Sequence, residues 1–146
     1  MTTKKTYSAE ETKKIGGLLA KKIFALRPGK KAVIIGLLGD LGSGKTTLVQ
    51  GFLRASGWKK RITSPTFVLM RRYPLRGKKF KNIYHLDAYR LKSSEIHHLG
   101  LGDTIKDPRN IILAEWPENI KKKNWEGIKV RLAHGKKENE RVIRLQ

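Results

Sequence analysis

The stretch GDLGSGKT, at residues 39–46, determines what fold to expect for this chain. It carries every fixed position of the pattern G-x-x-x-x-G-K-[ST]. The glycines let the backbone turn so that several N–H groups point into one concavity, and a following helix adds its free amides and positive dipole end. The pattern therefore predicts a phosphate-binding loop between a strand and a helix. An ordinary glycine-rich turn with an incidental lysine is the alternative.

The segments on either side of the loop favour the phosphate-binding interpretation. Residues 32–38 form a nearly continuous apolar run, which suits a strand covered on both faces. Residues 46–55 have the apolar spacing of an amphipathic helix. Further upstream, Ser8 and Glu11 have the spacing of a capping box and predict a helix from about Ala9 to Leu26. The loop therefore has the strand and helix that the motif requires on its two sides.

The rest of the chain alternates between strand patterns and turn patterns. Strands are predicted at residues 67–73, 82–87, 110–115, 128–132 and 141–145, and a short helix at 94–99. Glycine in the links at 74–79 and 134–137 makes hairpins of the first two and the last two strands. We expect an α/β fold: a single three-layer P-loop NTPase domain over residues 1–146, with a central, mostly parallel sheet and antiparallel hairpin additions.

The polar residues of the loop have predicted tasks. Lys45 can reach the β- and γ-phosphates of a nucleotide, and the Thr46 hydroxyl is placed to ligate Mg²⁺. Hydrolysis also needs a carboxylate near the loop, and Asp87 and Glu115 each end an apolar strand. Either acid could instead cap a helix or pair with a lysine. The residues predicted to bind the nucleotide in this segment are Asp40, Leu41, Gly42, Ser43, Gly44, Lys45, Thr46 and Thr47.

The charge of the chain is strongly positive. It holds 33 Lys and Arg against 12 Asp and Glu, a formal net charge of +21. No acidic residue occurs between Asp40 and Asp87, an interval with eleven basic residues: Lys45, Arg54, Lys59, Lys60, Arg61, Arg71, Arg72, Arg76, Lys78, Lys79 and Lys81. Such a field attracts polyanions, nucleic acid first among them. A solvated, lysine-rich surface that keeps the protein soluble is an equally weighted interpretation.

Other features narrow the class of protein. Cysteine is absent, which rules out disulfides and thiolate metal sites. No apolar run reaches the roughly 18 residues that a membrane span needs, and the first residues lack the apolar core of a signal peptide. We therefore expect a cytoplasmic protein without a membrane segment.

Several short motifs follow the loop in a recognisable order. They are SPTF at residues 64–67, HLDAYRL at 85–91 and EWPE at 115–118. With the loop, this ordered set resembles the bacterial TsaE family over about residues 8–118. Members of that family are the small ATPases of the bacterial system that makes N6-threonylcarbamoyl-adenosine in tRNA.

The resemblance implies a function and partners. It implies an ATP site with Mg²⁺ and slow intrinsic ATP hydrolysis. It also implies a role that assists two partner subunits, which transfer the threonylcarbamoyl group to the adenosine at position 37 of tRNA. The family ATPase is not itself the transferase.

The resemblance also implies roles for single residues. Thr46 and Glu115 correspond to the Mg²⁺ ligands, and Asp87 to the residue that positions or activates the attacking water. Thr66, with Ser64 and Pro65, corresponds to a switch loop that senses the γ-phosphate. The remaining implied neighbours of the site are Tyr89, Arg90 and Trp116, and more loosely Arg141, as a contact of the nucleotide, and the residues near Ser8. The implied catalytic residues are Asp87, Lys45 and Thr66.

The basic charge departs from the family, whose members are commonly acidic or near neutral. One explanation of this charge is direct contact with tRNA through residues 71–81. The other is that the source organism has a lysine-rich proteome. Two other functions stay open on the residues. One is a P-loop small-molecule kinase, with Arg71, Arg72 and Arg76 in a lid. The other is a basic nucleic-acid-binding module with a vestigial loop.

Overall fold

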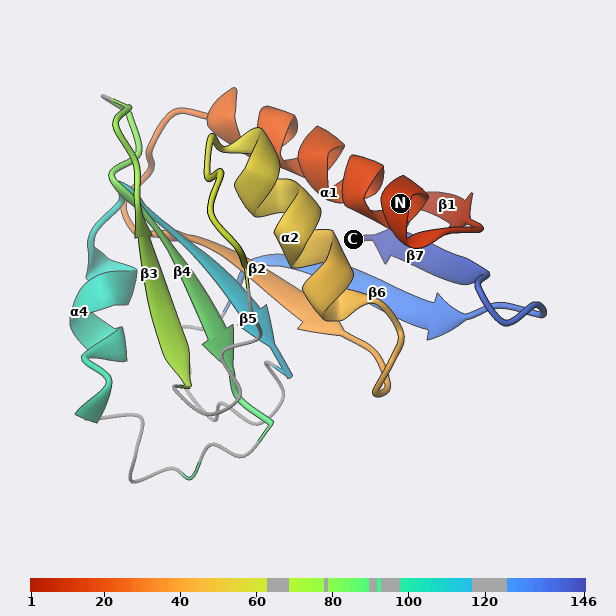
Figure 1. Cartoon of the computed structure of the whole chain (residues 1–146). Coiled ribbons are helices and arrows are strands. Elements are labelled where there is room, and N and C mark those ends of the chain that lie inside the picture. Colours follow the sequence, from red (N-terminus) through yellow and green to blue (C-terminus); the bar gives the residue numbers. More distant parts are fainter. Residues whose placement is uncertain (63–68, 78, 90–91, 93–97, 117–125) are drawn as a thin grey trace.

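The computed structural model contains one seven-stranded sheet with helices on both faces (Figure 1). It describes residues 1–62, 69–77, 79–89, 92, 98–116 and 126–146. The strands are β1 Thr2–Thr6, β2 Val33–Leu38, β3 Met70–Pro74, β4 Asn82–Asp87, β5 Asn110–Glu115, β6 Ile128–His134 and β7 Arg141–Leu145. The helices are α1 Ala9–Phe24, α2 Lys45–Ala55 and α4 Leu101–Lys106.

The sheet is parallel in its centre and antiparallel at both edges. Its strand order is β1-β7-β6-β2-β5-β4-β3. The pairs β6–β2, β2–β5 and β5–β4 are parallel, whereas β1–β7, β7–β6 and β4–β3 are antiparallel. The two predicted hairpins supply antiparallel pairs, as expected. The carboxyl ends of β2, β4 and β5 meet at one edge of the parallel part, where such sheets bind ligands.

Two apolar clusters make the three layers. One lies between the sheet and the pair α1 and α2, with Phe52, Ile35 and Leu113 among its fully buried members. The other lies on the opposite face of the sheet, under α4, and includes Leu101 and Ile112. The expected three-layer α/β architecture is therefore confirmed.

Helices α1 and α2 pack with their backbones almost in contact. A Cβ atom on Gly16 would lie 2.1 Å from the carbonyl oxygen of Leu48, and one on Gly51 would lie 2.0 Å from that of Lys13. No side chain fits at either position without moving a backbone. Because the last two residues of the phosphate-loop motif, Lys45 and Thr46, already belong to α2, this contact fixes the helix whose amino terminus borders the loop.

The helix and strand predictions can be compared with the structure. The bounds of β4, β5 and β7 are as predicted, and Ser8 Oγ caps α1 by accepting a hydrogen bond from Glu11 N at 3.1 Å. Helix α1 ends at Phe24 and not at Leu26. Two elements were not predicted: the edge strand β1 and helix α4.

Two of the predicted elements lie partly outside the residues that the structure describes. The helix expected at 94–99 lies mostly outside the described residues, as do the first residues of the strand expected at 67–73. Within the described ranges, no helix is long and apolar enough to cross a membrane.

Candidate functional site

The phosphate-loop motif joins the end of β2 to the start of α2, and glycine is required at two of its positions. Gly44 is the N-cap of α2 with φ 101°, and no side chain caps the helix there. Gly39 has φ 153°, and a Cβ atom on it would lie 2.3 Å from the carbonyl oxygen of Leu132 on β6. The uncapped first turn of α2 therefore offers its backbone N–H groups to an anion.

Lys45 is held over the loop. Its ammonium donates hydrogen bonds to the carbonyl oxygens of Gly39 and of Asp40, the latter at 2.9 Å. It also lies 4.2 Å from the centroid of the Trp116 ring. The side chain is only 5% exposed, yet it lines the pocket beside the loop. Its charge is thus concentrated at the position where phosphate oxygens would enter.

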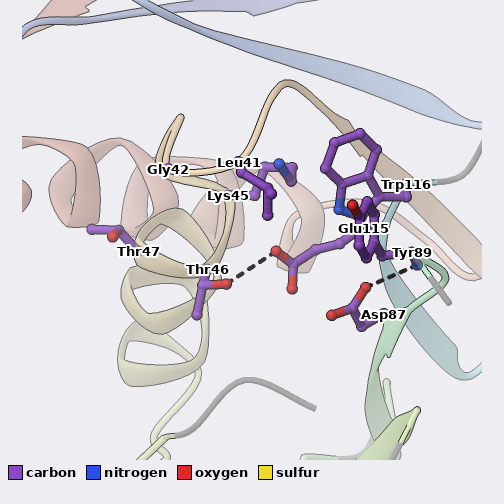
Figure 2. Close-up of a pocket in the computed structure, with 10 residues that line it drawn as sticks. Leu41, Gly42, Lys45, Thr46, Thr47, Asp87, Tyr89, Glu115 and Trp116 are labelled. Atoms are coloured by element: carbon purple, nitrogen blue, oxygen red, sulfur yellow. Dashed lines mark hydrogen bonds between the residues drawn. The ribbon is translucent and has the colours of Figure 1, made fainter. Parts of the chain in front are cut away.

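A chain of hydrogen bonds links α2, β5 and β4. Thr46 Oγ1 donates to Glu115 Oε1 at 3.0 Å, and His85 Nε2 lies 2.7 Å from Glu115 Oε2 (Figure 2 shows the first of these contacts). Glu115 is 4% exposed and His85 is fully buried. Of the two candidate carboxylates, Glu115 is therefore the one that contacts the loop threonine.

The donor set at Thr46 and Glu115 fits Mg²⁺. Both side chains present oxygen, which is the ligand that Mg²⁺ prefers. Among the described residues, no group of three or more His, Cys, Asp or Glu could form an all-protein metal site.

Asp87 lies beside Glu115, at the end of the neighbouring strand. The two residues are paired in the parallel β4–β5 register. Asp87 Oδ1 accepts a hydrogen bond from the backbone N–H of Tyr89 at 3.0 Å (Figure 2). The Tyr89 ring in turn lies 5.0 Å from that of Trp116, measured between centroids. The carboxylate therefore has a fixed orientation and lies apart from the Thr46 contact.

These side chains border one pocket of about 420 Å³ (Figure 2). A pocket of this size is within the range that holds small ligands and cofactors. Its walls come from the loop and the start of α2 and from the ends of β4 and β5. Its lining residues are Leu41, Gly42, Gly44, Lys45, Thr46, Thr47, Asp87, Tyr89, Glu115 and Trp116.

Arg141 braces the loop from the last strand. Its Nε donates to the carbonyl oxygen of Gly42 at 3.2 Å, and its Nη1 donates to those of Glu138 and Glu140 at 2.7 and 2.9 Å. A smaller cavity of about 120 Å³ adjoins Arg141 on this side of the loop and also borders Ser8. The structure thus places both loosely predicted contacts against the loop.

The turn that carries Arg141 is organised by Glu140. Glu140 Oε2 accepts hydrogen bonds from the backbone N–H groups of Lys136 and Lys137, at 3.1 and 3.2 Å. The Lys5 ammonium lies 3.6 Å from its other carboxylate oxygen. The hydrogen bond from Lys137, together with the charge of Lys5, lowers the pKa of the Glu140 carboxyl.

Most of the predicted site residues come together at this edge of the sheet. Asp40 contributes its backbone carbonyl, and its side chain is exposed. The Ser43 hydroxyl is buried and has no hydrogen-bond partner among the described residues. Thr66, Ser64 and Pro65 lie outside the described residues, as does Arg90.

Two contacts of the site were not foreseen. His134 Nε2 lies 3.2 Å from the carbonyl oxygen of Leu41, at the outer side of the loop. The other is the contact between His85 and Glu115, since no role was predicted for His85. The alternation of His85 with Asp87 was the available signal, because it places both side chains on one face of β4.

The family model of the "Threonylcarbamoyl adenosine biosynthesis protein TsaE" matches residues 6–143. The chain belongs to the TsaE family. The residues that the family model matches include the phosphate loop, the carboxylates of Asp87 and Glu115, and Arg141. Two TsaE proteins named for tRNA threonylcarbamoyladenosine biosynthesis illustrate the similarity. The one from Haemophilus influenzae is 41% identical over 90 residues, which are 61% of this chain and 54% of that protein.

The second relative, from Rickettsia conorii, is 43% identical over 116 residues, which are 78% of this chain and 60% of that protein. The chain thus spans little more than half the length of these curated relatives. A similar fold is found in the crystal structure of Bacillus subtilis YdiB. It superposes with a TM-score of 0.72 at 26% identity and covers 97% of this chain and 82% of that one.

Proposed function

We propose that this TsaE family member is a Mg²⁺-dependent ATPase that supports threonylcarbamoyl-adenosine modification of tRNA at position 37. One arrangement supports the proposal most directly: a phosphate loop, its lysine, a threonine–glutamate pair and a second carboxylate all border one pocket. The family match to TsaE, residues 6–143, supports the biological context. The partners are two subunits that carry out the transfer of the threonylcarbamoyl group.

The residues of the pocket divide the work of binding. The loop amides and the first turn of α2 bind the phosphates of ATP, and Lys45 moves from the loop carbonyls to the β- and γ-phosphate oxygens. Thr46 and Glu115 hold Mg²⁺, which when bound neutralises the charge on the phosphates. Arg141 and the residues near Ser8 contact the nucleotide on the other side of the loop.

Asp87 serves the hydrolytic step. Its carboxylate accepts the Tyr89 N–H, which fixes the direction of its oxygens. From the end of β4 it orients a water molecule and accepts its proton as the water oxygen bonds to the γ-phosphorus. The bond from that phosphorus to ADP breaks, and ADP and inorganic phosphate are released. Thr66 is proposed to sense the γ-phosphate from the adjoining switch loop.

The test is ATP hydrolysis measured in three steps: with the full chain alone, then with the two expected partner subunits, then with tRNA added. Mg²⁺-dependent release of inorganic phosphate that the partners and tRNA alter is the expected result. ATP consumption that requires a small-molecule acceptor and yields a phosphorylated product would favour the kinase alternative. Binding of tRNA without any affinity for ATP would favour the basic binding module.

A basic surface adds a proposed contact with tRNA. It is formed by the exposed cations of β3 and the adjoining link: Arg71, Arg72, Arg76, Lys79 and Lys81. These residues lie on an edge strand and its turn, so a long polyanion can reach them without displacing other elements. This basic surface is therefore proposed to bind the phosphate backbone of tRNA.

A further inference from the structure

We propose that His85 is a positioning residue that holds Glu115 in the orientation needed to bind the divalent cation. The proposal rests on the proposed function, because it concerns the same cation site. His85 lies on β4, two residues before Asp87, and is fully buried. It is not among the described residues that line the pocket, so it acts through another residue.

The β4–β5 register brings the imidazole to the carboxylate. Asp87 pairs with Glu115 and His85 pairs with Leu113. Side chains paired in this way in a parallel sheet point to the same face. For these residues that is the face covered by α2, since Leu113 belongs to the cluster that includes Phe52. His85 therefore lies beside Leu113, two residues before Glu115 on β5, and on the face of the sheet that α2 covers.

Both oxygens of Glu115 are consequently held. Oε1 accepts from Thr46 Oγ1 at 3.0 Å, and Oε2 lies 2.7 Å from His85 Nε2. An ionised carboxylate only accepts hydrogen bonds, so Nε2 is the donor in the second contact. One bond comes from α2 and the other from β4, so the carboxylate plane is fixed from two independent elements.

The other ring nitrogen shows that this contact is the reason for a histidine here. His85 Nδ1 is buried and has no hydrogen-bond partner in the described part of the chain. A buried polar atom without a partner costs stability, which an apolar side chain would avoid. The neighbours Ile83 and Leu113 form a cluster that such a side chain could extend. The hydrogen bond to Glu115 offsets this cost.

The expected effect concerns the cation and not the phosphates. Carboxylates that bind metals are usually themselves hydrogen-bonded, and loss of such a partner typically lowers metal affinity by about 10- to 100-fold. Without the Nε2 donor, Glu115 can rotate away from the cation. Among the described residues that line the nucleotide pocket His85 does not occur, so metal-free nucleotide binding should be unaffected.

The experiment measures binding of a fluorescent ATP analogue by the full chain during a titration with MgCl₂, and again in EDTA. His85→Leu removes the donor at similar size, and His85→Gln keeps an N–H donor. His98→Gln, at an exposed histidine, is the matched control. We expect His85→Leu to raise the half-saturating Mg²⁺ concentration about 10- to 100-fold. Affinity in EDTA should stay unchanged, and His85→Gln should restore most of the loss.

A double variant shows whether His85 acts through Glu115. In a Glu115→Gln background, adding His85→Leu should cause no further loss, because the group that it positions is already altered. Independent, additive losses would overturn the proposal. An unshifted Mg²⁺ titration for His85→Leu, or an equal loss of affinity in EDTA, would overturn it as well.

Two further outcomes are separable. If His85→Leu does not fold, His85→Asn replaces it, since its amide is too short to reach Glu115. A shift for Asn but not for Gln supports the proposal, and equal shifts overturn it. Wild-type protein that binds no nucleotide with Mg²⁺ would defeat the proposed function and this inference together. Wild-type binding with an unshifted Leu variant defeats only the inference.

Discussion

The Lys45 ammonium lies 4.2 Å from the centroid of the Trp116 ring and donates hydrogen bonds to two carbonyl oxygens of the phosphate loop. Trp116 follows β5 with a φ of 58°, a conformation that is unusual for a bulky residue and often marks a functional site. Its backbone N–H donates to the carbonyl oxygen of Leu37 at 3.2 Å, which holds the turn against β2. The end of β5 thus supplies both the carboxylate of Glu115 and an aromatic surface for the lysine.

Replacing Lys45 should abolish nucleotide binding or turnover. Lys45→Ala removes the only cation among the residues described as lining the pocket. The measurement is binding of a fluorescent ATP analogue together with phosphate release, and Lys22→Ala, at an exposed position of α1, is the control. Hydrolysis at the wild-type rate by Lys45→Ala would reject this pocket as the site.

Replacing Asp87 should separate binding from hydrolysis. Asp87→Asn keeps the shape of the side chain and an oxygen that can accept the Tyr89 N–H, but it cannot accept a proton. We expect nucleotide affinity within a few-fold of wild type and a rate lower by roughly 10²- to 10⁴-fold, the usual contribution of a general base. Single-turnover assays with bound ATP measure the step directly. Equal losses of affinity and rate would contradict the assigned role.

The contact between α1 and α2 predicts opposite effects for two adjacent glycines. Gly16→Ala would place a methyl group 2.1 Å from the Leu48 carbonyl oxygen, so it should destabilise the fold by about 1–3 kcal/mol. Gly17→Ala would meet the Ala55 side chain at an ordinary 3.5 Å and should be neutral or stabilise α1 by up to about 1 kcal/mol. Urea denaturation of both variants checks the difference. If Gly16→Ala and Gly17→Ala had similar free energies of unfolding, the close contact between α1 and α2 would not limit the size of the side chain at position 16.

The lowered pKa of Glu140 predicts a dependence of stability on pH. The folded state favours the ionised carboxyl, so its contribution is complete above the unfolded value, 4.5, and is lost as pH falls through the lower folded value. The free energy of unfolding of Glu140→Gln should therefore be lower than that of the wild type at neutral pH. In acid, the two free energies should converge. Denaturation at a series of pH values checks this. Parallel curves down to the acid limit would refute the linkage.

The basic surface predicts how tRNA binding responds to charge. Neutralising Lys79 and Lys81 of this surface, together with Lys78 of the same stretch of sequence, should weaken tRNA binding at fixed salt. It should also make the plot of log affinity against log salt shallower, because fewer counterions are released. Fluorescence anisotropy at several salt concentrations measures both quantities. The control is the same number of neutral substitutions at the exposed α1 lysines Lys14, Lys21 and Lys22. An unchanged titration would remove this basic surface from consideration.

The buried strands could be predicted because their pattern is local. In β5 every residue from Asn110 to Glu115 is buried, and a nearly continuous apolar run is what such a strand requires. Strand β1, with the sequence TTKKT, has no apolar residue. Its conformation comes from pairing with β7, more than a hundred residues away in the chain. Helix α4 has only six residues, too few for helical periodicity to show.

In the candidate site, too, the local features could be predicted and the long-range contacts could not. The phosphate loop could be predicted because its residues are contiguous, and their task follows from their order. The Glu115–His85 contact depends on β4 lying beside β5, and strand order is not visible in the spacing of residues. Resemblance to the TsaE family placed Arg141 near the nucleotide, but its hydrogen bond to Gly42 spans 99 positions and could only be found in the folded chain.

That long-range brace has a consequence for how the protein matures on the ribosome. The loop, β2 and α2 are all synthesised within the first part of the chain, yet the guanidinium that steadies the loop belongs to its final strand. A nascent chain can form the glycine-rich bend early, but the loop gains this brace only once the β6–β7 hairpin has emerged and joined the sheet. The proposed nucleotide pocket would therefore be completed late, after the synthesis of β7.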